Sequence, residues 1–352
     1  MAGLSSARLG IGILAHNEAA RLPLLFESLF KQSVFGERAG AGRSIHVVCI
    51  PNGCNDDTST VAKRCLADAV ARLGNACVTW AVDELAAAGK ANAWNHCVHA
   101  SLASCDYLCL LDADIIFASE STLASALAVL DEDPRVCVAT DRPIKRNPDD
   151  QTGWLARLSR YFSQAAPAGP TEICGQFYCA RASVLRSIWL PPGLPVEDGF
   201  LRAMVITDEF RHPEDPHRIA RAEHASHYFE AKTNPRDLWR HKKRLMIGTT
   251  LNALLFRHLW NRAGSRGAGE LLREQLQSDP AWLSRYLSEE SGRHAWVVPM
   301  GHVFRRLADL RTAPLLQAAR RAPVAVAATA VDLLAAASAN REIKRNLGLG
   351  YW

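Results

Sequence analysis

Short β-rich runs alternate with helical stretches over the first 145 residues, and this alternation restricts the possible folds more than any other feature. Apolar or β-branched runs cover residues 9–15, 45–50, 77–83 and 107–113, and amphipathic patterns lie between them. Strands and helices that alternate in this way predict a parallel sheet with crossover helices. We therefore expect an α/β fold whose ligands bind beyond the carboxyl ends of the strands.

Beyond residue 146 the pattern becomes less regular, and helices dominate from Asn234 onward. A strand is expected at residues 173–180, before a proline-rich loop. The change predicts a catalytic domain followed by a helical C-terminal annex. The boundaries we expect are 1–230 for the catalytic domain, which divides into halves at about residue 145, and 231–352 for the helical region.

The size and composition of the chain favour a cytoplasmic protein. Of its 352 residues 48% are hydrophobic, so it can bury a large core without disulfides. Its 10 cysteines contain no CxxC pair, and we expect reduced thiols rather than a zinc site. The first ten residues have neither a basic start nor an apolar run of signal-peptide length.

The longest apolar run covers residues 322–339, is mostly alanine and contains Asp332 near its middle. A charge at the bilayer centre costs about 3 kcal/mol, and alanine contributes little to offset it. We therefore reject a membrane span in favour of a packed helix. An interfacial helix at the inner face of the membrane is the alternative.

Basic residues gather at 236–244, in the sequence RDLWRHKKR, within a chain of net charge +5. Such a cluster suits a diphosphate or anionic lipid, which would make the protein peripheral to a membrane. A solvated helix face is the simpler alternative. Nucleic-acid binding is not expected, because few aromatic residues are interleaved with the basic ones.

Asp112 and Asp114 stand where an apolar strand pattern ends, in the sequence YLCLLDAD. Side chains two residues apart in a strand point to the same side, so these carboxylates would repel unless a cation lay between them. Mg²⁺ or Mn²⁺, sharing its shell with a diphosphate, meets that requirement. A solvated strand end is the alternative, and the position after a buried strand favours the metal site.

Two helix starts carry further charged candidates. Glu197 and Asp198 open a helical run after a proline-rich loop, and one of them near the metal site would act as a general base. Acidic residues at a helix start are also ordinary capping. Lys90 follows Gly89 at another helix start, where backbone amides and the ammonium group suit an anion, although a lysine at such a position is more often merely solvated.

Seven motifs in order make the chain resemble the GT-A glycosyltransferases of family 2, over roughly residues 9–248. They are AHNE (15–18), PNGCNDDT (51–58), GKANAWN (89–95), DAD (112–114), GQFYCAR (175–181), VEDGFL (196–201) and RHKKRL (240–245). The resemblance implies a Rossmann-like nucleotide-sugar domain, with a nucleotide-binding half at about 1–145 and an acceptor half at about 146–230. No single motif is decisive, but seven at family-like spacings make coincidence improbable.

The resemblance also implies a role for each matching residue. On the donor side, Asn17, Glu18 and Asn52 would line the base and ribose pocket, Lys90 would lie near the donor, Asp112 would face the ribose and metal, and Asp114 would bind the metal. On the acceptor side, Asp198 would be the base with Glu197 beside it, and His241 or Arg244 would add positive charge. Gly175 would let the backbone of its loop approach the acceptor or sugar, and Arg181 would brace the same loop.

Two departures from the family pattern refine this expectation. Pro51 and Asn52 replace an acidic pair in the nucleotide loop, which puts the identity of the donor in doubt. Of the Gln-x-x-Arg-Trp motif of processive members only Arg244 is retained, and Leu245 stands in place of the tryptophan. A tryptophan there helps to hold a polymer acceptor, so we expect a non-processive enzyme that adds one sugar.

The sequence thus predicts an inverting transfer from a UDP-sugar, with GDP-mannose as second choice, to a hydroxyl of a glycan or lipid-linked acceptor. His224 and His227 would offer a third metal ligand, although hydrogen-bonded structural histidines are the simpler interpretation. For His16 the simpler interpretation is likewise structural, as a residue that shapes the first loop. Loops 143–169 and 187–195 would set acceptor specificity. The alternatives are a catalytically degenerate binding protein, and a nucleotidyltransferase, whose glycine-rich loop after the first strand is missing from AHNEAARL.

Overall fold

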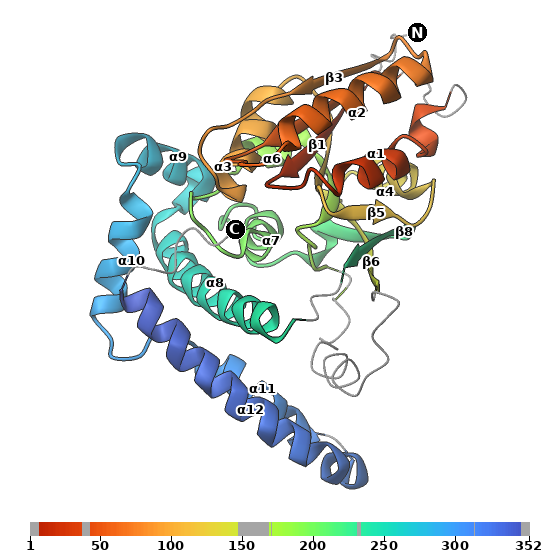
Figure 1. Cartoon of the computed structure of the whole chain (residues 1–352). Coiled ribbons are helices and arrows are strands. Elements are labelled where there is room, and N and C mark those ends of the chain that lie inside the picture. The colour runs from red at the N-terminus through yellow and green to blue at the C-terminus, as the bar shows by residue number, and fades with distance from the viewer. Residues whose placement is uncertain are drawn as a thin grey trace.

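An eight-stranded mixed sheet forms the centre of the molecule (Figure 1). The computed structural model describes residues 7–36, 43–146, 169, 171–230, 234–312 and 314–345. The strand order is β3-β2-β1-β4-β7-β6-β8-β5. The strands are β1 (Leu9–Ala15), β2 (Ile45–Pro51), β3 (Val78–Val82), β4 (Tyr107–Asp112), β5 (Ile115–Phe117), β6 (Val138–Arg146), β7 (Phe177–Arg181) and β8 (Ile219–Glu230).

The parallel sheet expected from the N-terminal pattern is present in β3, β2, β1 and β4. Beyond β4 the sheet is mixed, because β7 runs antiparallel to both β4 and β6. All seven residues of β1 are buried, as expected for a central strand that is covered on both faces. The predicted α/β class is therefore confirmed, with an antiparallel extension.

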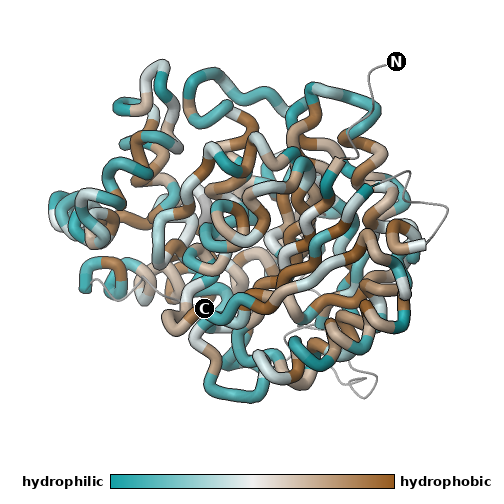
Figure 2. Tube along the Cα trace, turned by 90° about the horizontal axis from the view of Figure 1, so that it is seen from above, coloured by the Kyte–Doolittle hydropathy of each residue, from teal (hydrophilic) through white to brown (hydrophobic). Residues whose placement is uncertain are grey.

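Helices cover both faces of the sheet and bury a separate apolar core on each. One core lies under α1 (Leu22–Leu29), α2 (Thr58–Leu73) and α4 (Thr122–Glu132). The other lies under α3 (Lys90–His96), α6 (Ala182–Ser187) and α7 (Glu197–Ile206). Figure 2 shows hydrophobic residues concentrated along the central strands and hydrophilic residues on the outer helices.

The C-terminal region is helical, as predicted, and consists of five α-helices in the described residues. These are α8 (Pro235–Arg262), α9 (Ala268–Ser278), α10 (Trp282–Gly292), α11 (Met300–Thr312) and α12 (Leu315–Lys344). α8 packs against α7, while α11 and α12 lie side by side and form an arm beyond it (Figure 1). One described helix segment, Gln317–Lys344 of α12, is long and apolar enough to cross a membrane by length and composition alone.

A disulfide joins Cys109 of β4 to Cys179 of β7. The two cysteines are direct partners in the antiparallel register of these strands and are both fully buried. Our expectation that all cysteines are reduced thiols is therefore wrong for this pair, although the other eight are free. A separation of 70 residues hides the pairing from sequence analysis, because it depends on which strands become neighbours.

Candidate active site

The loops that follow β1, β2 and β4 meet at one edge of the sheet, as the parallel pattern predicted. The ring Nδ1 of His16 lies 2.7 Å from the carbonyl oxygen of Asn52. The backbone N–H of Ala113 donates to the carbonyl of Leu14 at 3.2 Å. The residues that follow β1, β2 and β4 therefore lie close together.

Asn17 and Glu18 occupy the first of these loops. Asn17 has a left-handed backbone, with φ of 57°, and its Oδ1 accepts a hydrogen bond from the N–H of Asn55 at 2.8 Å. Glu18 forms a 3.1 Å ion pair with Arg21. Burial raises the pKa of Glu18 despite Arg21, and the negative charge of Asp114 adds to the increase. Glu18 and Asp114 therefore lie close enough to interact.

Asn52 is fully buried, which is at odds with its predicted contact to the donor. Its Nδ2 donates to the carbonyl of Ala15 at 2.9 Å, and its Oδ1 accepts from the N–H of Gly89 at 3.0 Å. The side chain thus ties the ends of β1 and β2 to the loop that precedes α3. Asn52 therefore stabilises the loops around the site. An amide with no exposed surface cannot reach a ligand.

Lys90 is the centre of the charged network. Its ammonium lies 2.7 Å from Oδ1 of Asp112 and 2.8 Å from Oε1 of Glu197, and it donates to the carbonyl of Gly175 at 3.1 Å. Burial disfavours the charged lysine, but the two carboxylates outweigh this effect and raise the pKa of Lys90. One cation therefore holds together the end of β4, the start of α7 and the loop before β7.

Asp112 and Asp114 lie at and just beyond the end of β4. Burial raises the pKa of Asp112 to about 6; Lys90 opposes the increase, and Asp114 adds to it. Within the described residues, the carboxylate of Asp114 makes no hydrogen bond and no ion pair. Asp112 is therefore paired with Lys90, whereas the oxygens of Asp114 are available to a cation.

The residues at this edge fit a divalent ion that is shared with a bound diphosphate. Among the described residues, no group of three or more His, Cys, Asp and Glu side chains is arranged to hold a metal by itself. Mg²⁺ is commonly held by one or two carboxylates together with substrate phosphates and water, so a complete protein cage is not required. Asp114 and Asp112 supply oxygen donors of the type such an ion prefers.

Glu197 and Asp198 form the first turn of α7, and their environments separate their pKa values. Glu197 is buried, yet Lys90 outweighs the effect of burial and lowers its pKa. Burial and the neighbouring charge of Glu197 raise the pKa of Asp198, although the N–H of Gly199 donates to its Oδ1 at 2.7 Å. Adjacent carboxylates whose pKa values shift in opposite directions can have different roles: Glu197 stays an anion, and Asp198 can accept a proton.

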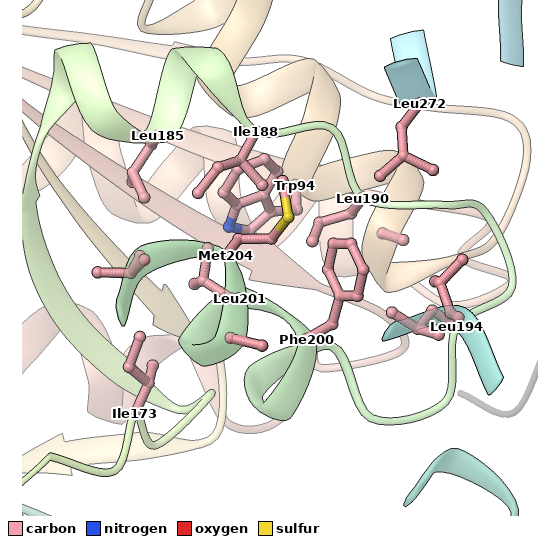
Figure 3. Close-up of a cluster of buried hydrophobic side chains, with 14 of the residues drawn as sticks. Trp94, Ile173, Leu185, Ile188, Leu190, Leu194, Phe200, Leu201, Met204 and Leu272 are labelled. Atoms are coloured by element: carbon pink, nitrogen blue, oxygen red, sulfur yellow. The ribbon is translucent and has the colours of Figure 1, made fainter. Parts of the chain in front are cut away.

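The start of α7 is anchored by an apolar cluster on one side of the sheet (Figure 3). Phe200, Leu201 and Met204 of α7 are buried there with Trp94 of α3. The indole N–H of Trp94 donates to the hydroxyl of Tyr178 at 2.6 Å. These contacts fix the direction in which α7 presents its two carboxylates.

Gly175 lies directly against these carboxylates, and its predicted approach to the acceptor or sugar stays a prediction. A Cβ built at this position would lie 3.2 Å from Oε1 of Glu197 and 3.3 Å from Cβ of Asp198. Such contacts are closer than ordinary van der Waals distance. A side chain at residue 175 would therefore press on the candidate base.

α8 contacts the loop before α7 at three residues, and the sequence analysis missed two of them. Arg244 donates to the carbonyl of Pro195 at 2.9 Å, and Asn252 donates to the carbonyl of Val196 at 3.0 Å. A Cβ at Gly248 would lie 2.2 Å from Cγ2 of Val196. Arg244, Gly248 and Asn252 are spaced four residues apart, which places them on one face of α8. This spacing is the only sequence signal that could have grouped them.

Arg181 does not lie at the site, so its predicted role in bracing the acceptor loop is wrong. It pairs with Tyr107 at the end of β4 remote from Asp112, where Leu111 is paired with Phe177. Four residues of strand separate the two ends by about 13 Å. Its guanidinium donates instead to the carbonyls of Val136, Leu130 and Asp133. β7 runs antiparallel to β4, so the residue that ends its motif points away from the site.

The histidines fall into different environments. His227 is fully buried, with Nδ1 at 2.7 Å from Oδ2 of Asp141 and Nε2 at 3.5 Å from Oε1 of Gln176. The backbone carbonyl of Gln176 accepts from the N–H of Asp112, so this pair lies near the end of β4. His224 is exposed on β8, and His241 is partly buried on α8. Most of the predicted acceptor loop 143–169 lies outside the described residues.

The fold and this arrangement of charges define the GT-A class of nucleotide-sugar transferases. The model of glycosyl transferase family 2 matches residues 11–189, which is about half of the chain, and the chain belongs to this family. It is therefore a glycosyltransferase, as the motifs predicted. No curated protein sequence matches the chain.

Several solved structures are similar to the chain at low sequence identity. A mannosyltransferase from Pyrobaculum calidifontis, solved with GDP-Man and Mn²⁺, is 15% identical with a TM-score of 0.51, over 93% of this chain and 87% of its own. Glucosyl-3-phosphoglycerate synthase from Mycobacterium tuberculosis, solved with Mg²⁺ and UDP, is 15% identical with a TM-score of 0.47, over 72% and 80%. TarS from S. aureus, solved with UDP, is 17% identical with a TM-score of 0.46, over 96% and 91%.

Proposed function

We propose that this glycosyltransferase moves a single sugar from a nucleotide-sugar donor to an acceptor hydroxyl, with inversion at the anomeric carbon. The observation that carries the proposal is the position of Asp198. It combines a raised pKa with a place beside the Lys90 network that reaches Asp112. A carboxylate whose pKa is raised by its surroundings is a stronger proton acceptor than one in water.

In the proposed step, Asp198 takes the proton of the acceptor hydroxyl as its oxygen attacks the anomeric carbon. The bond between that carbon and the diphosphate oxygen breaks, and its electron pair leaves with the nucleoside diphosphate. Glu197 stays ionised because Lys90 lowers its pKa, so it does not compete for the proton. Arg244 lies on the same side, where its charge acts on both carboxylates.

For the donor side, we propose that Asp114, with Asp112 in support, holds Mn²⁺ or Mg²⁺. When bound, the ion supplies positive charge to the leaving diphosphate. Asn17 and Glu18, at the end of β1, would border the base and ribose. A UDP-sugar is the favoured donor and GDP-mannose the second, and the acceptor hydroxyl belongs to a glycan or a lipid-linked saccharide.

The proposal is tested by measuring nucleoside diphosphate release from UDP-glucose, UDP-N-acetylglucosamine and GDP-mannose. Each donor is incubated with Mn²⁺ and with panels of soluble glycans and of extracted lipids as acceptors. We expect release that depends on both an acceptor and one donor, with a β-linked product from an α-linked donor. A product that retains the configuration of the donor would contradict the single-displacement mechanism, and binding without transfer would indicate a degenerate binding protein.

A further inference from the structure

An exposed apolar stripe runs along one face of α12. Every third or fourth residue of the helix contributes to it, a spacing that places the side chains on a single face. The exposed fraction is 59% for Val326 and 65% for Leu334. The stripe consists of Pro323, Val326, Ala327, Ala330, Val331, Leu334 and Ala337, all of which are exposed.

The opposite face of α12 is packed against the protein. Ala328, Asp332, Ala336 and Ala339 are buried there. Asp332 forms ion pairs with Lys242 of α8 and Arg306 of α11, the latter at 3.6 Å. The charge that led us to reject a membrane span is thus directed inward, and a helix with one face held by α8 and α11 is not surrounded by lipid.

Basic residues extend the stripe at both ends of α12. Arg320 precedes it, and Arg341, Lys344 and Arg345 follow it on the same face. Within the described residues, none of these four side chains forms an ion pair. The second acidic residue of α12, Glu342, is held by Lys243 of α8 at 2.6 Å. The exposed face is therefore apolar along its middle and positive at both ends.

This charge pattern distinguishes between two possible occupants of the stripe. A second copy related by a twofold axis would bring Arg320 near either Arg341 or its own counterpart, and like charges would meet in both cases. An anionic lipid surface accepts the apolar middle at the acyl boundary, while the basic ends bind headgroup phosphates. We propose that α12 docks lengthwise on an anionic membrane surface through this stripe.

Docking through α12 would tether the active site to the lipid surface by way of α8. Lys242 and Lys243 hold α12, and the next residue, Arg244, holds the loop before Glu197 and Asp198. The rigid connection therefore runs through consecutive residues of one helix. The docking proposal does not rest on the transfer reaction, and it is testable without a donor or an acceptor.

The test is flotation of the full chain with vesicles of phosphatidylcholine alone, or of phosphatidylcholine and phosphatidylglycerol in equal parts. We expect binding only to the anionic vesicles, and its loss as salt is raised. The double variant Val326→Glu/Leu334→Glu should reduce the bound fraction at least roughly tenfold, because both side chains would enter the acyl boundary. The triple variant Arg341→Gln/Lys344→Gln/Arg345→Gln should weaken binding without changing the stripe.

Leu24→Glu is the matched control, because Leu24 is an equally accessible leucine, 53% exposed, on α1. It should float like the unaltered protein, and circular dichroism should show that all variants are folded. Unchanged flotation of the double variant would overturn the proposal, as would a failure of the unaltered chain to bind at low salt. A dimer in sedimentation velocity that the double variant dissociates would instead show that the stripe binds a second copy.

Discussion

At the scale of single residues, Lys90 joins the two halves of the active site. Its ammonium contacts Asp112 on the side predicted for the donor and Glu197 on the side predicted for the acceptor. All three side chains are largely buried, so the pairs are poorly screened by water. The charge state of each carboxylate therefore depends on this one lysine.

Replacing Lys90 by methionine should destabilise the fold as well as impair function. The change leaves Asp112 and Glu197 buried without a cation, which typically costs about 3–5 kcal/mol in the free energy of unfolding. Urea unfolding of Lys90→Met measures this cost. Lys31→Met is the control, because Lys31 and Glu27 form an ion pair that is exposed on both sides, and its midpoint should not change. Equal effects of the two substitutions would show that the Lys90 network does not hold the site together.

Asp198→Asn should remove transfer while leaving the protein at least as stable. Loss of a general base lowers kcat by about 10²- to 10⁴-fold. Because the folded state raises the pKa of Asp198, its ionised form opposes folding at any pH above that pKa, and asparagine removes this penalty. Near-normal transfer by a folded Asp198→Asn protein would show that another group is the base.

The same shift gives the direction of the pH dependence. Transfer requires an ionised Asp198, so kcat should fall as the pH is lowered through the raised pKa of this carboxyl. The measurement is the pH profile of kcat at saturating donor, with a fold check at each pH. A rate that remains constant as the pH is lowered to the ordinary pKa range of aspartate would contradict the assignment.

Sequence analysis identified the charged residues that gather at the site, but it misplaced two of the residues around them. Asp112, Glu197 and Lys90 were expected near one another, and they form one network. Asn52 was assigned by motif to the donor pocket, but its side chain is buried, and Arg181, assigned to the acceptor loop, binds the carbonyl of Val136 instead. Burial of Asn52 and the direction of β7 are tertiary properties, which a local motif does not encode.

At the scale of elements, α8 holds the start of α7, which carries the proposed base Asp198. Its contacts reach the backbone of the Pro195–Val196 segment, immediately before Glu197 and Asp198. The close packing at Gly248 leaves no room for a side chain. α8 therefore belongs to the candidate site, although it lies beyond residue 230, the boundary that we predict for the catalytic domain.

Gly248→Ala provides the test of this element. Alanine in a helix interior usually stabilises by about 1 kcal/mol relative to glycine, but here the methyl group would collide with Val196 and cost about 1–3 kcal/mol. We also expect a lower kcat, because Asp198 would be displaced. Gly301→Ala on α11 is the control, since a Cβ there meets no atom within 4 Å. A stabilised and fully active Gly248→Ala protein would rule out the positioning role.

The elements of the N-terminal half were predictable because each strand and helix carries its own periodicity. β1, β2, β3 and β4 occur where the apolar runs predicted them. The antiparallel partners of β7 and the disulfide to Cys109 were not predictable, since they depend on which distant strands become neighbours. Local patterns specify elements, whereas the order of strands in the sheet is decided by packing.

At the scale of the whole molecule, the sheet and the helical region contribute different groups to the candidate site. The sheet brings the groups proposed for the donor side to the ends of β1 and β4, while α7 and α8 carry those proposed for the acceptor side. α12 places an apolar and basic face on the outside of the same assembly. The sequence indicated that α12 would be a packed helix, but only the structure shows that one face of it is left uncovered.

The central claim is that Asp114, at the end of β4, binds a nucleotide diphosphate through a divalent ion. The most direct test is calorimetric titration of the purified chain with UDP and with GDP, each with and without Mn²⁺, repeated on Asp114→Ala. We predict that one nucleotide binds only when Mn²⁺ is present, and that the variant loses this binding while remaining folded. Binding of equal strength in the variant, or no binding of either nucleotide to the folded protein, would contradict the claim.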